Sequence, residues 1–171
     1  MSPEAKHGGE NLTQEIERKF LITALPPELD LNSCKATKID QGYLMADSTA
    51  AVRVRRKGDK YFMTYKRASD SHSAARVELV TELSAEQFET LWPGTEGRRV
   101  EKTRYEIPFG SHVIELDIFA GENAGHMLAE VEFTSTEAAD VFQPPAWFHQ
   151  DVTPDPRFGN SSIADRGFPV L

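Results

Sequence analysis

A short run near the start of the chain combines residues that could bind a metal ion and an anion together. In Glu15-Ile16-Glu17-Arg18-Lys19, the alternation of a β-strand places Glu15, Glu17 and Lys19 on one face. Carboxylate oxygens are natural ligands of hard divalent cations such as Mg²⁺, which often complete their shell with substrate phosphate. A lysine on the same face can bind that phosphate. Taken alone, however, the run is more typical of the wet face of an amphipathic strand.

Charged residues alternate with apolar ones along several other segments. The charged positions are Arg53 and Arg55, Arg76 and Glu78, Lys102 and Arg104, Glu115 and Asp117, and Glu130 and Glu132, and Lys66 shares a face with Thr64. Acidic pairs and basic pairs stand on different segments, whereas charges on an ordinary surface are more often mixed. This segregation favours a charged interior that binds an anion and a cation.

The elements that must position these residues are mostly β-strands. Period-two patterns predict eight strands, over Gln14–Ile22, Lys38–Met45, Ala51–Arg56, Tyr61–Arg67, Ala75–Leu83, Val100–Pro108, His112–Phe119 and Met127–Phe133. Gly58-Asp59 predicts a tight hairpin between the third and fourth, and Phe109-Gly110-Ser111 predicts another between the sixth and seventh. Neighbouring strands are therefore expected to be antiparallel.

Helix signals interrupt the strands. Ser84 with Gln87 forms a capping-box pattern ahead of a helix that Pro93-Gly94 should stop. Ser135 can cap a second helix that ends before Pro144-Pro145, and a short third helix after Pro156 is weakly signalled.

Two architectures fit this pattern. In a β-sandwich, the apolar faces form the core and the charges are solvated, which would make the chain an interaction protein. In a closed eight-stranded antiparallel barrel, the charged face points inward and helices cover the apolar outside. The segregated charges favour the second, a mainly β (α+β) tunnel.

Composition limits the class of protein. The chain has 171 residues, which suits one domain over residues 12–171 after a loose polar tail at residues 1–11 without signal-peptide features, so a cytoplasmic location is expected. No apolar run reaches membrane length, and a net charge of −8 argues against binding a nucleic acid duplex. Cys34 is the only cysteine, which excludes an internal disulfide.

The pattern resembles a known family. Glu15-Ile16-Glu17-Arg18-Lys19 matches the ExExK signature of the CYTH superfamily, the triphosphate tunnel metalloenzymes. Further matches follow in family order: Gln41-Gly42-Tyr43-Leu44, Val52-Arg53-Val54-Arg55, Thr64-Tyr65-Lys66, Arg76-Val77-Glu78, Glu101-Lys102-Thr103-Arg104-Tyr105, Glu115-Leu116-Asp117, Glu130-Val131-Glu132 and Asp151-Val152-Thr153. Leu91-Trp92-Pro93 and Glu96-Gly97-Arg98-Arg99-Val100 look like the short bacterial inorganic triphosphatases within it.

This resemblance implies a tunnel that binds a triphosphate with Mg²⁺ or Mn²⁺. It assigns substrate binding to Lys19, Arg53, Arg55, Lys66, Arg76, Glu78, Lys102 and Arg104, and metal binding to Glu15, Glu17, Asp117, Glu130 and Glu132. The residues expected to act in catalysis are Glu15, Glu17, Lys66, Lys102 and Tyr43. Hydrolysis of inorganic triphosphate would give pyrophosphate and phosphate.

Other activities stay open at this point. The same tunnel could serve thiamine triphosphate, nucleoside triphosphates or class IV adenylate cyclase chemistry, or could be a non-catalytic sensor of polyphosphate or nucleotides. Val80 stands where family members often carry a second glutamate after the position of Glu78, which weakens metal binding on that strand. The expected partner is a small-molecule triphosphate, and a homodimer is compatible with the sequence.

Overall fold

The computed structural model describes residues 16–68 and 76–170. The predicted tail (residues 1–11), Glu15 and residues 69–75, where a loop is expected from the Ser/Ala/Asp-rich sequence, lie outside these ranges.

All eight predicted strands are present, with ends that differ by at most a few residues. They are β1 (Ile16–Ile22), β2 (Lys35–Ala46), β3 (Ala50–Lys57), β4 (Lys60–Ala68), β5 (Arg76–Leu83), β6 (Arg99–Phe109), β7 (His112–Phe119) and β8 (Met127–Phe133). The α-helices are α1 (Ala85–Leu91), α2 (Thr136–Val141) and α3 (Asn160–Arg166), and the 3₁₀ turns are η1 (Leu31–Ser33), η2 (Trp92–Thr95), η3 (Gly121–Asn123) and η4 (Pro156–Phe158).

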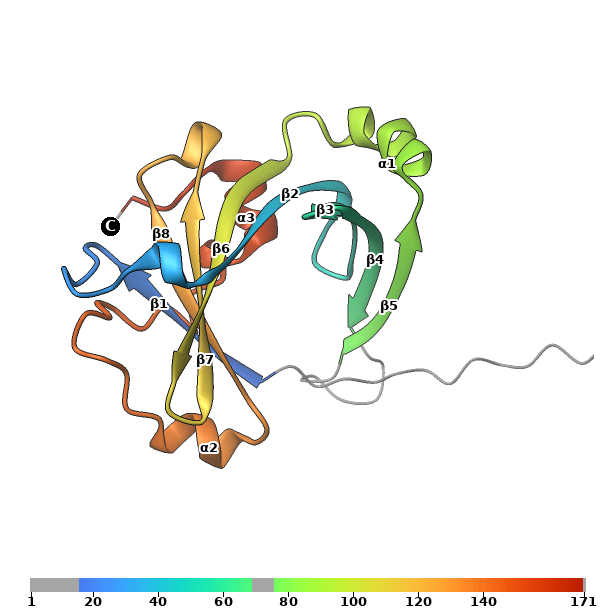
Figure 1. Ribbon diagram of the computed structural model, residues 1–171. Coiled ribbons are helices and arrows are strands. Elements are labelled where there is room, and N and C mark those ends of the chain that lie inside the picture. Colours follow the sequence, from blue (N-terminus) through green and yellow to red (C-terminus); the bar gives the residue numbers. More distant parts are fainter. Residues whose placement is uncertain (1–15, 69–75, 171) are drawn as a thin grey trace, which may run out of the picture.

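The strands form one antiparallel sheet in the order β1-β8-β7-β6-β2-β3-β4-β5. The sheet curls, so that β1, β8, β7 and β6 lie across from β3, β4 and β5 (Figure 1). Both predicted hairpins are confirmed, with Gly58 and Gly110 at φ near +58° and +59°, a conformation that suits glycine. The fold is thus the predicted eight-stranded antiparallel sheet with a few helices.

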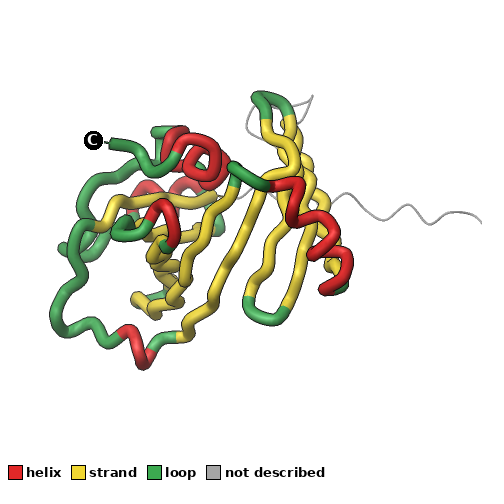
Figure 2. Tube along the Cα trace, turned by 90° about the horizontal axis from the view of Figure 1, so that it is seen from above, coloured by secondary structure: helices red, strands yellow, loops and turns green. Residues whose placement is uncertain are grey.

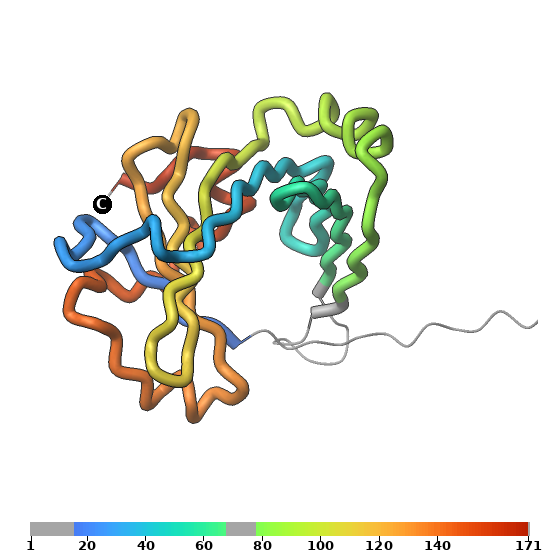
Figure 3. Tube along the Cα trace, in the orientation of Figure 1, coloured from blue at the N-terminus to red at the C-terminus, as the bar shows by residue number. Residues whose placement is uncertain are grey.

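In the part of the chain that the structure describes, the predicted closed barrel is not closed by hydrogen bonds between its first and last strands in the sheet order, β1 and β5. Within the described residues no ladder joins these two edge strands. The physical reason is that a C-terminal strap (residues 149–153) already bonds the outer edge of β1: His149 N donates to Leu21 O, and Val152 N donates to Lys19 O at 2.9 Å. Figure 3 shows this part of the chain returning from α2 to β1.

The apolar outer face of β1, β8, β7 and β6 forms the main core. Phe20, Ile114, Leu116 and Val131 are almost completely buried there, together with Phe142 and other residues after α2. On the other side, α1 covers β3 and β4, where Phe88 packs against Tyr61 with ring centroids 5.0 Å apart. The helices α1 and α2 therefore lie outside the strands, as Figure 2 shows for α1 along the edge of the β3–β5 region.

The predicted helix caps are confirmed. Ser84 and Gln87 form a full capping box at α1, and the Ser135 side chain accepts from Ala138 N at the start of α2. Pro93-Gly94 lie inside η2 rather than at a simple stop, because proline is accepted in the first turn of a helix. No helix in the described ranges has both the length and the apolar character needed to cross a bilayer.

The inner face of the sheet changes from charged to apolar at one end. At this end of the interior, each inward series of charges gives way to an apolar side chain two residues away on the same strand: Leu21 and Phe119 follow the charges of β1 and β7, and Val100 and Leu128 precede those of β6 and β8. We call η4 and α3 the C-terminal cap (residues 156–166). Its Phe158 and Ile163, each 1% exposed, pack among these residues, so the cap fills that end of the interior.

The core gives a first prediction. Leu116→Ala should lower the free energy of unfolding by about 2–5 kcal/mol. Leu116 is completely buried, so the substitution leaves a cavity in the core that the surrounding side chains fill only in part. Leu79→Ala is the matched control, since Leu79 is 60% exposed on β5. Denaturant unfolding measures both, and equal losses would contradict the assigned core.

Candidate functional site

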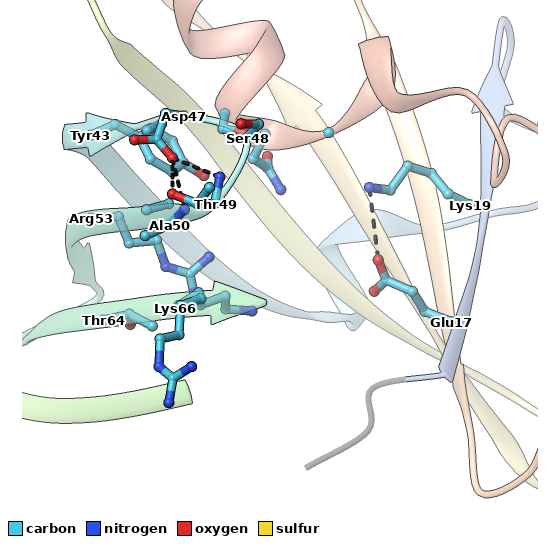
Figure 4. A pocket seen from close by; sticks show the side chains of 16 residues that line it. Glu17, Lys19, Tyr43, Asp47, Ser48, Thr49, Ala50, Arg53, Thr64 and Lys66 are labelled. Carbon is cyan, nitrogen blue, oxygen red and sulfur yellow. Dashed lines mark hydrogen bonds and ion pairs between the residues drawn. The ribbon is translucent and has the colours of Figure 1, made fainter. Parts of the chain in front are cut away.

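A polar pocket of about 370 Å³ opens on the inner face of the sheet. Glu17 and Lys19 of β1 point into it from one side, and Arg53, Thr64 and Lys66 of β3 and β4 lie on the other (Figure 4). Its remaining lining comes from the turn between β2 and β3 and from the start of α3: Tyr43, Ala46, Asp47, Ser48, Thr49, Ala50, Ala51, Arg67, Gly159, Asn160 and Ser161. The curled sheet thus brings together residues that are far apart in the sequence.

Strand register explains the arrangement on β3, β4 and β5. Arg53 lies opposite Thr64, and Lys66 lies opposite Glu78, so all four side chains share the inner face. The Lys66 ammonium is 3.5 Å from a Glu78 carboxylate oxygen. Arg76 lies at the start of β5, beyond the part of that strand whose side chains are described.

The arginines of β3 carry more positive charge than their surroundings balance. Arg53 Nε is buried, and within the described residues it has no hydrogen-bond partner. Burial, followed by the like charges of Arg53 and Arg104, lowers the pKa of Arg55 to about 10. Buried polar groups are normally paired, and an unpaired one costs free energy. The site is therefore arranged to receive an anion.

Gln41 and Tyr43 support these arginines from β2. Arg55 Nε donates to the Gln41 side-chain oxygen at 3.1 Å, and Gln41 Nε2 donates to the Tyr43 hydroxyl at 3.3 Å. Burial raises the pKa of Tyr43, although Arg53 and Arg55 oppose this. Tyr43 and Lys66 both line the pocket, but the contacts of Tyr43 are with Gln41 and Arg53.

Deeper inside, β6, β7 and β8 form a network of ion pairs. Asp117 Oδ2 accepts from Lys102 Nζ at 2.5 Å, and both side chains are 1% exposed. Arg104 forms a fork with Asp117 at 2.7 and 2.8 Å and reaches Glu130 at 3.0 Å. Arg104 also forms an ion pair with the Glu115 carboxylate. These side chains hold one another in fixed positions below the pocket.

Burial and pairing shift the protonation of this network. Burial alone would raise the pKa of Asp117, but Lys102 and Arg104 hold it below its ordinary value of 3.8. For Lys102, burial outweighs Asp117 and lowers the pKa. Burial also raises the pKa of Glu115, against the effect of Arg104.

The predicted metal ligands divide into two groups. Asp117 and Glu130 are engaged by lysine and arginine, with Lys19 Nζ 3.2 Å from Glu130. Glu17 lies directly opposite Glu132 on β1 and β8, and one of its carboxylate oxygens is 3.9 Å from Lys19 Nζ. In the ranges that the structure describes, no three acidic, histidine or cysteine side chains are arranged as a metal cage, and Glu15 falls outside those ranges. Facing carboxylates repel, so Glu17 and Glu132 fit a bound divalent cation.

Sequence patterns alone do not predict Gln41 as a partner of Arg55, or Asn160 and Ser161 as lining of the pocket. Gln41 stands out only within a family motif, and Asn160 and Ser161 begin α3, a helix that the sequence signals weakly. Gly159-Asn160-Ser161 is a helix-start composition that could have marked this segment. Its approach to the strands depends on long-range packing, which period-two patterns do not encode.

Comparisons with known proteins identify the family of this chain. A family model described as the CYTH domain matches residues 13–143. This chain belongs to the CYTH domain family. It is 44% identical over 153 residues to a protein named inorganic triphosphatase from Nitrosomonas europaea, covering 88% of this chain and 96% of the relative. An inorganic triphosphatase from Acetivibrio thermocellus is 36% identical over 151 residues, covering 88% and 92%.

Solved structures share the fold of this CYTH domain. The crystal structure of the inorganic triphosphatase NE1496 matches with a TM-score of 0.69 at 42% identity, covering 92% of this chain and 97% of that one. A putative adenylate cyclase from Bacillus halodurans matches with a TM-score of 0.52 at 17% identity, covering 82% and 96%, which shows the shared fold alone.

The buried network gives a prediction on stability. Asp117→Asn should lower the free energy of unfolding at neutral pH by about 3–5 kcal/mol, because it removes the carboxylate paired with the buried Lys102 and breaks the fork with Arg104, which keeps Glu130 and Glu115. Asp165→Asn is the control, since Asp165 forms an exposed pair with Arg166 and should be nearly neutral. Denaturant unfolding compares the two, and a similar small effect for both would contradict the role of Asp117.

The ion pairs of Asp117 also predict that the free energy of unfolding depends on pH. The pKa of Asp117 is lower in the folded state than its ordinary 3.8, so its stabilising effect is complete above that value and is lost as pH falls through the folded pKa. The difference in unfolding free energy between the wild type and Asp117→Asn should therefore narrow below about pH 4. A difference that stays constant from pH 7 to pH 3 would contradict this assignment.

Proposed function

We propose that this CYTH domain is an inorganic triphosphatase that hydrolyses a linear triphosphate to pyrophosphate and phosphate in the presence of a divalent metal. The observation that carries the proposal is the group of inward arginines without a balancing anion, above all the unpaired Arg53 Nε. The 44% and 36% identical relatives are both named inorganic triphosphatases, which supports the same activity here.

The cationic side of the pocket binds the phosphate chain. Arg53 and Arg55 supply planar guanidinium groups, and Lys19 and Lys66 supply point charges from opposite sides. Charge-assisted hydrogen bonds of this kind orient the terminal phosphate as well as hold it. Arg76 belongs to the same set by its place on β5.

The acidic side provides the metal site. Glu17 and Glu132, with Glu15, would hold Mg²⁺ or Mn²⁺. Asp117 and Glu130 are the further metal candidates from the sequence, and they would lie below such an ion, paired with Lys102, Arg104 and Lys19. When bound, the metal neutralises phosphate charge and favours ionisation of a water molecule.

Hydrolysis then follows from positioning and charge. A water oxygen attacks the terminal phosphorus in line, the bond between that phosphorus and the bridging oxygen breaks, and the bridging oxygen leaves with pyrophosphate. Glu17 lies at the pocket to accept a proton from the water, and Lys102 with Arg104 stabilises the negative charge that develops on the leaving group. Tyr43, which interacts with Arg53 and lines the same pocket as Lys66, would assist proton movement with Lys66.

The substrate assignment rests on chemistry of the lining. Tyr43 is the one aromatic side chain among the described residues that line the pocket. A nucleoside or thiamine group would gain from stacking partners, whereas a bare phosphate chain needs only cations and hydrogen-bond donors. Inorganic triphosphate, a phosphate chain without an organic group, is therefore the proposed substrate.

Phosphate release from purified protein tests this proposal. With Mg²⁺ or Mn²⁺, release from inorganic triphosphate should exceed release from ATP and thiamine triphosphate, and a chelator should abolish it. Triphosphate binding without turnover would show a sensor instead, and preference for ATP would move the substrate to a nucleotide.

Arg53→Gln tests the cationic side separately. Loss of one charged hydrogen bond to substrate, worth about 1.5–3 kcal/mol, should lower kcat/KM by about 10- to 100-fold. Lys60→Gln is the control, an exposed lysine at the start of β4 that does not line the pocket. Equal kinetics for the two variants would place the phosphate site elsewhere.

A further inference from the structure

The C-terminal cap contacts two of the lysines assigned to the phosphate site. Asn160 Oδ1 accepts from Lys102 Nζ at 3.0 Å, and the Phe158 carbonyl oxygen accepts from Lys19 Nζ at 3.4 Å. Both acceptors are neutral oxygens from adjacent turns of the cap. The segment that closes the apolar end of the interior therefore also holds basic side chains of the site.

The cap can hold these lysines because it is itself firmly packed. Phe158 and Ile163 are each 1% exposed among the apolar residues that end the inner face of the sheet. The Asp155 side chain accepts from Arg157 N and fixes the start of η4. Asn160, placed between Phe158 and Ile163, thus has little freedom to move away from Lys102.

Local helix chemistry does not account for the orientation of Asn160. Asparagine near a helix start commonly accepts a hydrogen bond from a backbone N–H of its own helix. At α3 the N-cap is Gly159, without a side-chain cap, and the Asn160 oxygen is directed to Lys102 instead. The hydrogen bond therefore positions Lys102 on β6 and does not cap α3.

The ammonium of Lys102 has a defined set of acceptors. A lysine ammonium can donate three hydrogen bonds. Among the described residues two acceptors meet it, Asp117 Oδ2 at 2.5 Å and Asn160 Oδ1 at 3.0 Å. Lys102 does not line the pocket, whereas Asn160 does. Asn160 therefore links the Lys102 ammonium to the lining of the pocket, and one of its three N–H donors has no acceptor among the described residues.

We propose that Asn160 is a positioning residue for the reaction, acting through Lys102. Asn160 and Asp117 together fix the position of the Lys102 ammonium. In that position the third N–H of the ammonium reaches an oxygen of the leaving pyrophosphate. Without Asn160, Lys102 would be held by Asp117 alone and would lie farther from the substrate. This role rests on the proposed triphosphatase activity.

The test compares Asn160→Ala with Asn160→Asp in steady-state kinetics on inorganic triphosphate with Mg²⁺. Asn160→Ala should lower kcat by about 10- to 100-fold with KM nearly unchanged, because a misplaced Lys102 affects the transition state more than binding. Asn160→Asp keeps an acceptor oxygen, so it should recover most of kcat. Its added negative charge faces the phosphate chain and should raise KM instead.

Controls separate this role from a purely structural one. Asp165→Asn lies on the same helix, exposed and away from the pocket, and should leave kcat, KM and the melting temperature unchanged. A kcat for Asn160→Ala within about twofold of wild type, or equal losses of kcat for the Ala and Asp variants, would overturn the inference. An inactive wild type would instead reject the triphosphatase activity on which it rests.

Discussion

The interior of this domain depends on one buried carboxylate, Asp117. It accepts from both Lys102 and Arg104 where almost no water reaches, and each of those cations would be costly to bury alone. Because Asp117 pairs with both cations, and Glu130 and Glu115 add further pairs with Arg104, the strands β6, β7 and β8 can turn a charged face inward. The outer face is thereby free to form the apolar core with α2 and the segment that follows it.

Across the interior, the charge balance is different. Arg53 and Arg55 have glutamine, tyrosine and threonine beside them rather than a matching set of carboxylates. One half of the inner face is therefore internally neutralised and rigid, whereas the other half retains positive charge that a phosphate chain can satisfy. The C-terminal cap contacts the neutralised half at two strands, through Lys19 on β1 and Lys102 on β6.

Much of this arrangement could be predicted from the sequence. Period-two alternation identified all eight strands, and the same alternation predicted which residues share the inner face, because side chains on a strand alternate without exception between its two sides. The capping box at Ser84 is equally local, and it was confirmed. Segregation of acidic and basic pairs indicated that the charged face is enclosed.

What the sequence could not predict depends on contacts between distant segments. The strap that occupies the edge of β1 and the approach of Asn160 to Lys102 join residues more than 50 positions apart, at a weakly signalled helix. The division of the acidic residues is also a matter of three-dimensional pairing. Asp117 and Glu130 were predicted as metal ligands, and in the structure they hold basic side chains, whereas Glu17 and Glu132 face each other.

The most direct test of the central claim, that the enclosed charged face is the phosphate site, is a crystal structure of the protein with inorganic triphosphate and Mn²⁺. The account predicts the phosphate chain between Arg53, Lys66 and Lys19, with anomalous signal from Mn²⁺ near Glu17 and Glu132. Phosphate bound on the outside of the sheet, with the inward arginines unchanged, would contradict it.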